Sequence, residues 1–455
     1  MYRENCPGCK MDQRKEEKLG IPYREFLYVW IISLCTALPI SSLFPFLYFM
    51  IKDLHIAKRE EDIGFYAGFV GSAFMLGRAL TSVLWGLVSD HYGRKPVIMI
   101  SIISVIIFNT LFGLSTSYWM AIATRLLLGS LNGLLGPIKA YAIEVCRAEH
   151  QPIGLSLVST AWGIGLVIGP AIGGFFAQPA EKYPKIFSKE SFFGRFPYFL
   201  PCFCISLFAV GAFISCFWLA ETLHNHSDHD EETDGTPASK KNLFKNWPLM
   251  SSIIVYCVFS LHDMAYTEIF SIWAVSDKLY GGLSFSSQDV GEVLAVTGCS
   301  LLVFQLFLYI WISKLLGPII SARVAAVITI PLGAAYPFMS RLSGFKLSLV
   351  VNCTSVLKNI LSLIVITGMF ILQNNAVPQH QRGAANGISV TGQSLFKAVA
   401  PACAGAIFSW AQKRQKASFL PGDQMVFFIV NVIEAIGFLL TFEPFLVPAN
   451  KTEQE

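Results

Sequence analysis

A short charged stretch, Trp85-Gly86-Leu87-Val88-Ser89-Asp90-His91-Tyr92-Gly93-Arg94-Lys95-Pro96, separates two long apolar segments. Each of these segments, at about 63–88 and 97–116, is long enough to cross a bilayer as a helix. Because the stretch between them is short, both helices have to reach the same side of the membrane. Gly86 permits close helix contact, Gly93 permits a turn with positive φ, and Pro96 suits the first turn of the next helix.

The composition is typical of a chain that crosses a membrane many times. Of the 455 residues, 54% are hydrophobic and 14% are charged. In soluble domains, about a quarter of the residues are charged. The net charge of +4 gives no basis for nucleic-acid binding. The N-terminus is mostly polar and the first apolar run is already long enough to span, so we expect no cleavable signal peptide.

Apolar runs of about twenty residues predict twelve transmembrane helices in an all-α membrane protein. Their approximate limits are 26–50, 63–88, 97–116, 118–143, 152–177, 196–219, 248–275, 289–312, 318–340, 347–372, 384–411 and 423–447. The predicted domains are a tail (1–25), a six-helix bundle (26–219), a polar linker (220–247), a second six-helix bundle (248–448) and a short tail (449–455). Lysines and arginines are nearly balanced between the two sides, with a small cytosolic excess from the basic N-terminal tail. The even number of spans and the charged loop from Gly86 to Lys95 favour two cytosolic termini.

Two matching segments indicate an internal repeat. His150-Gln151 precedes the fifth span and His380-Gln381 precedes the eleventh. Further along, Gly169-Pro170-Ala171-Ile172-Gly173-Gly174 matches Ala400-Pro401-Ala402-Cys403-Ala404-Gly405. Duplicated halves of this kind are typical of transporters that bind substrate between the halves, near the middle of the membrane.

The pattern G-x-x-S-D-x-x-G-R-K, from Gly86 to Lys95, resembles the signature loop between helices two and three of the major facilitator superfamily. The resemblance implies that superfamily's fold of two six-helix bundles. We expect the loop to act as a gate latch on the cytosolic side. In this hypothesis Arg94 pairs with Glu144, near Arg147, while Asp90 faces the N-terminal amides of the eleventh span.

The fifth span carries Gly165, Gly169 and Gly173 on one helix face, with Pro170 and Gly174 beside them. Such a face permits close approach of a neighbouring helix, and the proline permits a bend. The pattern resembles the antiporter motif of proton-coupled exporters in the same superfamily. The alternative is a generic packing face of small residues.

The fourth span carries Arg125, followed by Gly129 and Gly133 on the same face. An arginine inside the membrane is costly and is usually functional. The pattern resembles the superfamily's fourth-helix motif, in which the arginine is linked to proton coupling. The alternative is an arginine that extends to the membrane interface.

Other charged and polar residues within spans are candidates for a substrate site. Four cations are predicted to line a cavity near the middle of the membrane: Arg78, Arg125, Lys358 and Lys397. Three carboxyl groups are candidate proton carriers, Asp263, Glu268 and Glu434, and His262 and Gln393 lie on the same helix faces as members of this set. The alternative is that several of these groups form structural ion pairs.

Cys6-Pro7-Gly8-Cys9 has the spacing of half a tetrahedral zinc site. The missing ligands are available in the linker, which carries His224, His226 and His229. The alternative is a solvated tail with two idle thiols. The other nine cysteines lie in or at apolar segments and are expected to be core residues rather than disulfide partners.

The combination of Cys-Pro-Gly-Cys with Glu221-Thr222-Leu223-His224-x-His226 resembles the plant zinc-induced facilitator-like family, as does the stretch from Gly77 to Gly86. Departures are Ala220, where a proline is usual, and His91, where a basic residue is common. The resemblance implies proton-coupled export or vacuolar sequestration of chelators such as nicotianamine and phytosiderophores. It also implies a role in zinc and iron homeostasis, with potassium or auxin transport as the family's other activities and the vacuolar or plasma membrane as location.

A cationic cavity suits a zwitterion with several carboxylates better than a bare metal ion, which would favour histidine and carboxylate ligands along its path. We therefore expect the lipid bilayer and a small carboxylate-bearing chelator as partners, a monomer, a proton gradient as driving force, and zinc only in regulation. A zinc-sensing receptor without transport is the rival class. An enzyme is disfavoured, because no span combines a nucleophile with a histidine and an acid.

Overall fold

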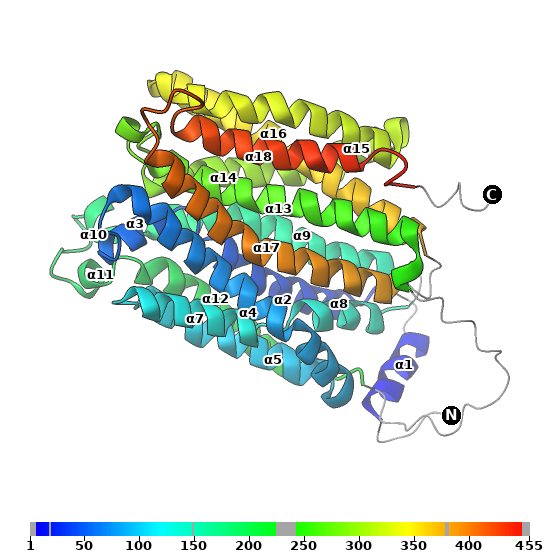
Figure 1. Ribbon diagram of the computed structural model, residues 1–455. Helices are drawn as coiled ribbons and strands as arrows, with labels where there is room; N and C mark the ends of the chain where they lie inside the picture. The colour runs from blue at the N-terminus through cyan, green and yellow to red at the C-terminus, as the bar shows by residue number, and fades with distance from the viewer. Residues whose placement is uncertain (1–5, 18–19, 148–149, 224–242, 378–381, 448–455) are drawn as a thin grey trace. The chain divides into compact units, whose positions relative to one another are not determined.

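The computed structural model describes residues 6–17, 20–147, 150–223, 243–377 and 382–447, and within them every regular element is a helix (Figure 1). The α-helices are α1 (Pro7–Glu17), α2 (Tyr23–Ser41), α3 (Leu47–Asp53), α4 (Ile63–Tyr92), α5 (Arg94–Ser104), α6 (Thr110–Gly113), α7 (Tyr118–Leu131), α8 (Leu135–Glu144), α9 (Gln151–Phe176), α10 (Pro179–Lys182), α11 (Phe192–Arg195), α12 (Phe199–Ser215), α13 (Trp247–Val275), α14 (Ser287–Val303), α15 (Tyr309–Ala335), α16 (Gly344–Asn375), α17 (Arg382–Gln412) and α18 (Asp423–Leu440). Two π-helical turns, η2 (Val105–Asn109) and η7 (Phe304–Leu308), and several short 3₁₀ turns connect them.

The twelve predicted spans all fall on helices. Among the described residues, ten helical stretches are long and apolar enough to cross a membrane. The other two predicted spans correspond to α9, which has a shorter apolar stretch at Thr160–Phe176, and to α14 with η7. The all-α class expected from the sequence is therefore confirmed.

Four spans differ in detail from the prediction. The first is interrupted between α2 and α3, where Pro45 cannot donate a backbone hydrogen bond. The fourth is broken between α7 and α8, where the indole of Trp85 and the hydroxyl of Thr81 both donate to the carbonyl of Ser130. The eighth and ninth are not separated by a loop, because η7 leads directly into α15, whose helical geometry is lost only at Gly317.

The chain divides into two compact units: unit 1 comprises Met1–Leu43 and Gly77–Ser239, and unit 2 comprises Phe44–Leu76 and Lys240–Glu455. The first half of α4 thus belongs to unit 2 and its second half to unit 1. These units group residues that lie close together in space, whereas the predicted bundle of residues 26–219 is a continuous range of the sequence. That predicted bundle stays a prediction.

In unit 1, α2 lies at the centre and packs against α8, α9 and α12. Its core includes Leu34 and Leu38 of α2, Ala161 of α9 and Ile205 of α12, all nearly inaccessible to solvent. In unit 2, the long helices α13, α15, α16 and α18 lie side by side, and α17 packs along α13 (Figure 1). Side chains of α13, α15 and α16 form an apolar core in unit 2.

Candidate functional site

The signature loop is a tight turn that one carboxylate holds together. Gly93 has φ = 106°, so it turns the chain between α4 and α5 in a conformation that other residues rarely adopt. The carboxylate of Glu221 accepts hydrogen bonds from the backbone amides of Arg94 (2.9 Å) and Lys95 (3.0 Å), which are the first two of α5. It therefore caps a helix whose first amides have no partner within the helix, and its negative charge suits the helix dipole.

The Arg94 side chain lies between two polar groups of unit 1. Its Nη2 atom is 3.0 Å from Oε1 of Glu144, and its Nη1 atom donates to the hydroxyl of Ser89 at 3.0 Å. The hydroxyl of Thr222 donates to the same Glu144 carboxylate. Exposed fractions of 17% for Arg94 and 33% for Glu144 place the pair at the edge of the unit.

The other residues of the predicted latch are distributed around this pair. The Lys95 ammonium donates to the carbonyls of Phe217 and Leu219, in the segment directly after α12. Gly86 lies within α4, with open space where a side chain would extend, and Arg147 lies just beyond α8. The Asp90 side chain lies outside the described part of the structure, so its predicted contact with the eleventh span stays a prediction.

The glycine face of the fifth span packs against α2. A Cβ atom on Gly165 would lie 2.5 Å from the Cβ of Ala37, and one on Gly169 or Gly173 would overlap Ser41 or Ser42. The Ser41 hydroxyl donates to the Gly165 carbonyl at 2.8 Å. Pro170 lies inside α9, and Gly174 is buried beside it. The small residues thus permit direct contact between the two backbones.

The matching segment of unit 2 makes a similar contact with the first half of α4. A Cβ atom on Gly68 would overlap the carbonyl of Pro401, and one on Gly405 would overlap the carbonyl of Gly64. The Ser72 hydroxyl accepts a hydrogen bond from the Ala402 amide at 2.9 Å. Both copies of the repeat are therefore places of close backbone packing.

Arg125 is enclosed within unit 1. It is 2% exposed, its Nη1 atom donates to the carbonyl of Pro39 at 3.0 Å, and its guanidinium lies 4.9 Å from the ring centroid of Phe112. Arg78 is partly buried on α4. Lys139 of α8 lies close enough for the two positive charges to repel each other. Arg78, Arg125 and Lys139 thus all lie within candidate spans of unit 1.

Unit 2 brings a buried histidine–carboxylate contact and an ion pair together on α13. His262 Nδ1 is 2.9 Å from Oε2 of Glu434 on α18, and each side chain is 3% exposed. The next residue, Asp263, lies 2.8 Å from the ammonium of Lys358 on α16. Lys358 is 1% exposed, whereas Asp263 is 27% exposed, so the carboxylate is the accessible member of that pair.

Aromatic and polar groups surround the Lys358 ammonium. It lies 3.7 Å from the ring centroid of Tyr266, close enough for a cation–π interaction. The Tyr266 hydroxyl is hydrogen-bonded to that of Tyr336, whose ring stacks on Phe427. On the neighbouring face of α16, Ser355 is hydrogen-bonded to Thr297 at 3.0 Å. The ammonium thus contacts two groups of α13, Asp263 and Tyr266, and the Tyr266 hydroxyl is in turn held by Tyr336.

The remaining candidates of unit 2 lie at different distances from these pairs. Gln393 of α17 donates to the Ser260 hydroxyl of α13 at 3.2 Å, and the charge of Lys397 acts on Asp263. Glu268 is 1% exposed but lies apart from the two pairs, next to Gly71 of α4, where an added Cβ would be 3.3 Å from its carboxylate. The two pairs therefore form the charged centre of unit 2.

The predicted zinc site is only half described. Cys6 and Cys9 are buried, at 3% and 6% exposure, and the Gly8 amide between them donates to the Leu223 carbonyl at 3.0 Å. His224, His226 and His229 lie outside the described residues. Within the described residues, no three potential ligands meet in a metal-binding arrangement.

The helix α1 lies near the end of α8. Burial raises the pKa of the Cys146 thiol, and the Lys15 ammonium of α1 lowers it in part. The tail that carries Cys6 and Cys9 is therefore packed against the same end of unit 1 as the signature loop.

Sequence reasoning missed several of the residues that make this geometry. Glu221 and Thr222 were recognised only as part of a family motif, because nothing in their spacing indicates contact with residues more than seventy positions earlier. Lys139 and Arg323, both charged and within candidate spans, were not singled out, although their presence in apolar segments is a signal that the sequence contains.

The chain is similar to known membrane transporters. The family model of the Major Facilitator Superfamily matches residues 29–401. The chain belongs to the major facilitator superfamily. Within it, the chain is 61% identical to zinc induced facilitator-like 1 of Arabidopsis thaliana, with 98% of this chain and 96% of the relative covered. It is 57% identical to zinc induced facilitator 1 of the same plant, with 99% and 97% covered.

These identities show that the chain is a member of the zinc-induced facilitator-like family, as its Cys-Pro-Gly-Cys and Glu-Thr-Leu-His motifs indicate. A solved structure of a D-xylose–proton symporter covers 94% of the chain with a TM-score of 0.71 at 14% identity, which shows the fold. This major facilitator is thus a multi-pass membrane transporter for a small molecule rather than an enzyme.

Proposed function

We propose that the protein is a proton-coupled antiporter that exports or sequesters a small metal chelator with several carboxylates, such as nicotianamine or a phytosiderophore. The observation that carries the proposal is that two pairs of titratable side chains, His262–Glu434 and Asp263–Lys358, lie next to each other in unit 2. The names of the two plant relatives, zinc induced facilitators, support a role in zinc homeostasis, and the proposal extends this role to iron, as the resemblance to the family implies.

The Asp263–Lys358 pair suits a zwitterionic substrate. A substrate carboxylate takes the place of Asp263 at the Lys358 ammonium, and a substrate ammonium pairs with the carboxylate that is released. The 27% exposure of Asp263 allows the exchange to begin at that carboxylate. The net charge of the site does not change, so the cost of a bare buried charge is avoided.

The His262–Glu434 pair suits the coupling proton. Imidazole and carboxylate are the side chains that exchange protons most readily in a protein interior, and neither has a permanent cation as its partner here. The charged neighbour of this pair is Asp263, the next residue of α13, on which His262, Lys358 and Lys397 all act. A proton added to the pair places positive charge beside Asp263, where the substrate ammonium binds. Because both compete for one negative charge, binding of the proton and release of the substrate are coupled.

The signature loop supplies the conformational part of the mechanism. In this proposal Gly86, Asp90, Gly93, Arg94, Lys95, Glu144 and Arg147 form a latch on the cytosolic side, with both termini cytosolic and the vacuolar or plasma membrane as location. The pair of Arg94 and Glu144 is partly exposed, so it opens at low cost. The packed glycines of α9 and Pro170 allow that helix to move against α2.

Proteoliposomes with an imposed pH gradient and labelled nicotianamine test the proposal. We expect concentrative uptake that collapses when the gradient is dissipated. Glu434→Gln should lose gradient-driven uptake but keep substrate exchange at equal pH, because it removes the proton site and leaves the Asp263–Lys358 pair. Lys358→Met should lose both. Asp90→Ala should transport poorly, and full transport by it would contradict the latch.

Other outcomes assign other functions. Flux of potassium or of an auxin-like anion without flux of any chelator favours those family activities. Tight zinc binding without flux of any chelator, amino acid, auxin or ion favours a zinc-sensing receptor.

A further inference from the structure

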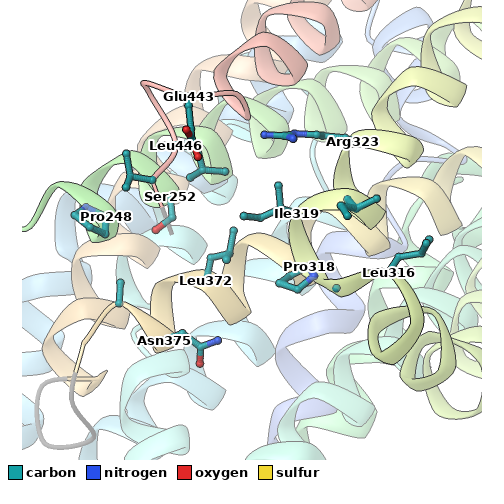
Figure 2. A pocket seen from close by; sticks show the side chains of 14 residues that line it. Pro248, Ser252, Leu316, Pro318, Ile319, Arg323, Leu372, Asn375, Glu443 and Leu446 are labelled. Carbon is teal, nitrogen blue, oxygen red and sulfur yellow. The ribbon is translucent and has the colours of Figure 1, made fainter. Parts of the chain in front are cut away.

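Unit 2 contains a cavity of about 470 Å³ that plays no part in the site described above. It is lined by the first turns of α13, the break in α15, the end of α16 and the chain that follows α18. Because all these parts lie at or near helix ends, the cavity lies near one surface of the membrane. Figure 2 shows Arg323 and Glu443 in the upper part of the cavity, with Leu372 and Pro318 below them.

The break in α15 shapes one wall of the cavity. Gly317 has φ = 71° and ψ = 168°, outside the helical region, and Pro318 starts the helix again. A Cβ on Gly317 would have no atom within 4 Å, so open space lies beside it. The hydroxyl of Ser321 donates to the Gly317 carbonyl at 2.6 Å and stabilises the new first turn.

Arg323 presents a fixed positive charge to the cavity. Its Nε atom donates to the Thr441 hydroxyl at 3.2 Å, its Nη2 atom donates to the Thr441 carbonyl, and its guanidinium stacks on Phe442 at 4.1 Å. All of these partners are neutral. Within the described part of the chain the guanidinium forms no ion pair, although Arg323 lies inside the candidate span Leu315–Arg341. A charged residue within an apolar span requires a partner, and the cavity is where an anion can bind it.

The cavity borders the lipid-facing surface of α15. Leu316 and Ile320 line it and are 37% and 54% exposed, and the nearby Leu315 is 83% exposed. Trp247, next to the lining residue Pro248, is 47% exposed and donates to the Phe445 carbonyl at 3.0 Å. Tryptophans in such positions are typical of the membrane–water interface. A ligand that fits has a charged head in the cavity and an apolar tail along α15.

We propose that this cavity binds the phosphoethanolamine headgroup of a membrane phospholipid. The phosphate pairs with Arg323, the primary ammonium lies toward the carboxylate of Glu443, and an acyl chain follows Leu316 and Ile320. The carboxylate favours a headgroup that carries both charges over one that is only anionic, and a primary ammonium donates hydrogen bonds that a quaternary one cannot. The inference does not depend on the transported substrate.

The test uses the purified full chain in detergent after removal of native lipid. The protein is incubated with equal amounts of dioleoyl phosphatidylethanolamine, phosphatidylcholine and phosphatidylglycerol, and the retained lipids are measured by mass spectrometry, with thermal unfolding in each lipid alone. We expect phosphatidylethanolamine to be retained preferentially. Arg323→Gln should weaken its retention about tenfold, the usual effect of losing a charge-assisted hydrogen bond. Glu443→Gln should remove the preference over phosphatidylcholine.

Arg341→Gln is the matched control, since Arg341 lies at the other end of the same span, stacked on Phe338 at 5.2 Å. It should retain lipid like the unchanged protein. Equal retention of the three lipids, or an Arg323→Gln variant that is folded by size-exclusion chromatography and binds phosphatidylethanolamine normally, overturns the proposal. The proposal is also overturned if soluble phosphoethanolamine displaces the lipid and binds with the same affinity. The occupant would then be a free phosphate compound.

Discussion

The two units use charged residues in opposite ways. In unit 1 the Arg94–Glu144 pair lies at helix ends, with exposed fractions of 17% and 33%. In unit 2 the His262–Glu434 pair lies in the middle of long helices, with 3% exposure on each side chain. An exposed pair exchanges its partners for water at little cost, whereas a buried pair opens only when another charged group replaces a partner. In the proposed mechanism, unit 1 therefore switches conformation and unit 2 exchanges the ligand and the proton.

The strongest test of this contrast is Asp263→Asn. It leaves the Lys358 ammonium, 1% exposed, without a counter-ion, and we expect a loss of about 3–5 kcal/mol in the free energy of unfolding. Lys358→Met should cost less, because Asp263 is partly exposed and water can solvate it. Denaturant-induced unfolding in micelles measures both, with Lys52→Met, from the exposed Lys52–Glu60 pair, as control. Equal stability of all three variants would contradict the distinction.

The next largest effect is expected at the signature loop, from Gly93→Ala. Alanine strains a backbone with φ = 106°, and its Cβ would lie 2.5 Å from the Glu221 carboxylate. We expect a loss of about 2–3 kcal/mol in unfolding free energy. Gly86→Ala, in the same stretch, has no atom within 4 Å of its Cβ and should be neutral or slightly stabilising. Unfolding measurements that rank the two variants the other way would show that the turn is not constrained.

A smaller effect is expected where α9 contacts α2. Gly169→Ala places a methyl group against Ser41 and should cost about 1–2 kcal/mol, since overpacking is only partly relieved by movement. If α9 moves during transport, the rate of substrate exchange should fall as well. Gly211→Ala on α12 is the control, with nothing within 4 Å of the added group. Unchanged exchange in Gly169→Ala would remove α9 from the moving parts.

The smallest effect is expected for Arg94→Lys. Lysine keeps the positive charge but lacks the planar guanidinium with which Arg94 contacts Glu144 and Ser89 at the same time. After allowance for screening by solvent, the stability change should be about 1 kcal/mol or less. A double-mutant cycle with Glu144→Gln measures the coupling of the two residues. A coupling energy as large as that of Asp263 and Lys358 would contradict the difference between the units.

The sequence by itself determined the fold class, the twelve spans and the family. Membrane helices need about twenty apolar residues in succession, and this requirement is local to the chain. Residue type and spacing also identified the charged stretch from Gly86 to Lys95, the glycines of the fifth span and the Cys-Pro-Gly-Cys motif, which forms the start of α1 in the structure.

The tertiary structure alone decided which residues meet. Glu221 reaches the amides of Arg94 and Lys95 from more than 120 positions later, and His262 meets Glu434 across a still longer separation. The sequence identified both His262 and Glu434 as candidates but gave no reason to pair them. The lack of an ion pair at Arg323, together with the cavity beside it, is likewise a property of the packed helices. Spacing along a helix fixes which residues share a face, but only packing decides which face lies opposite.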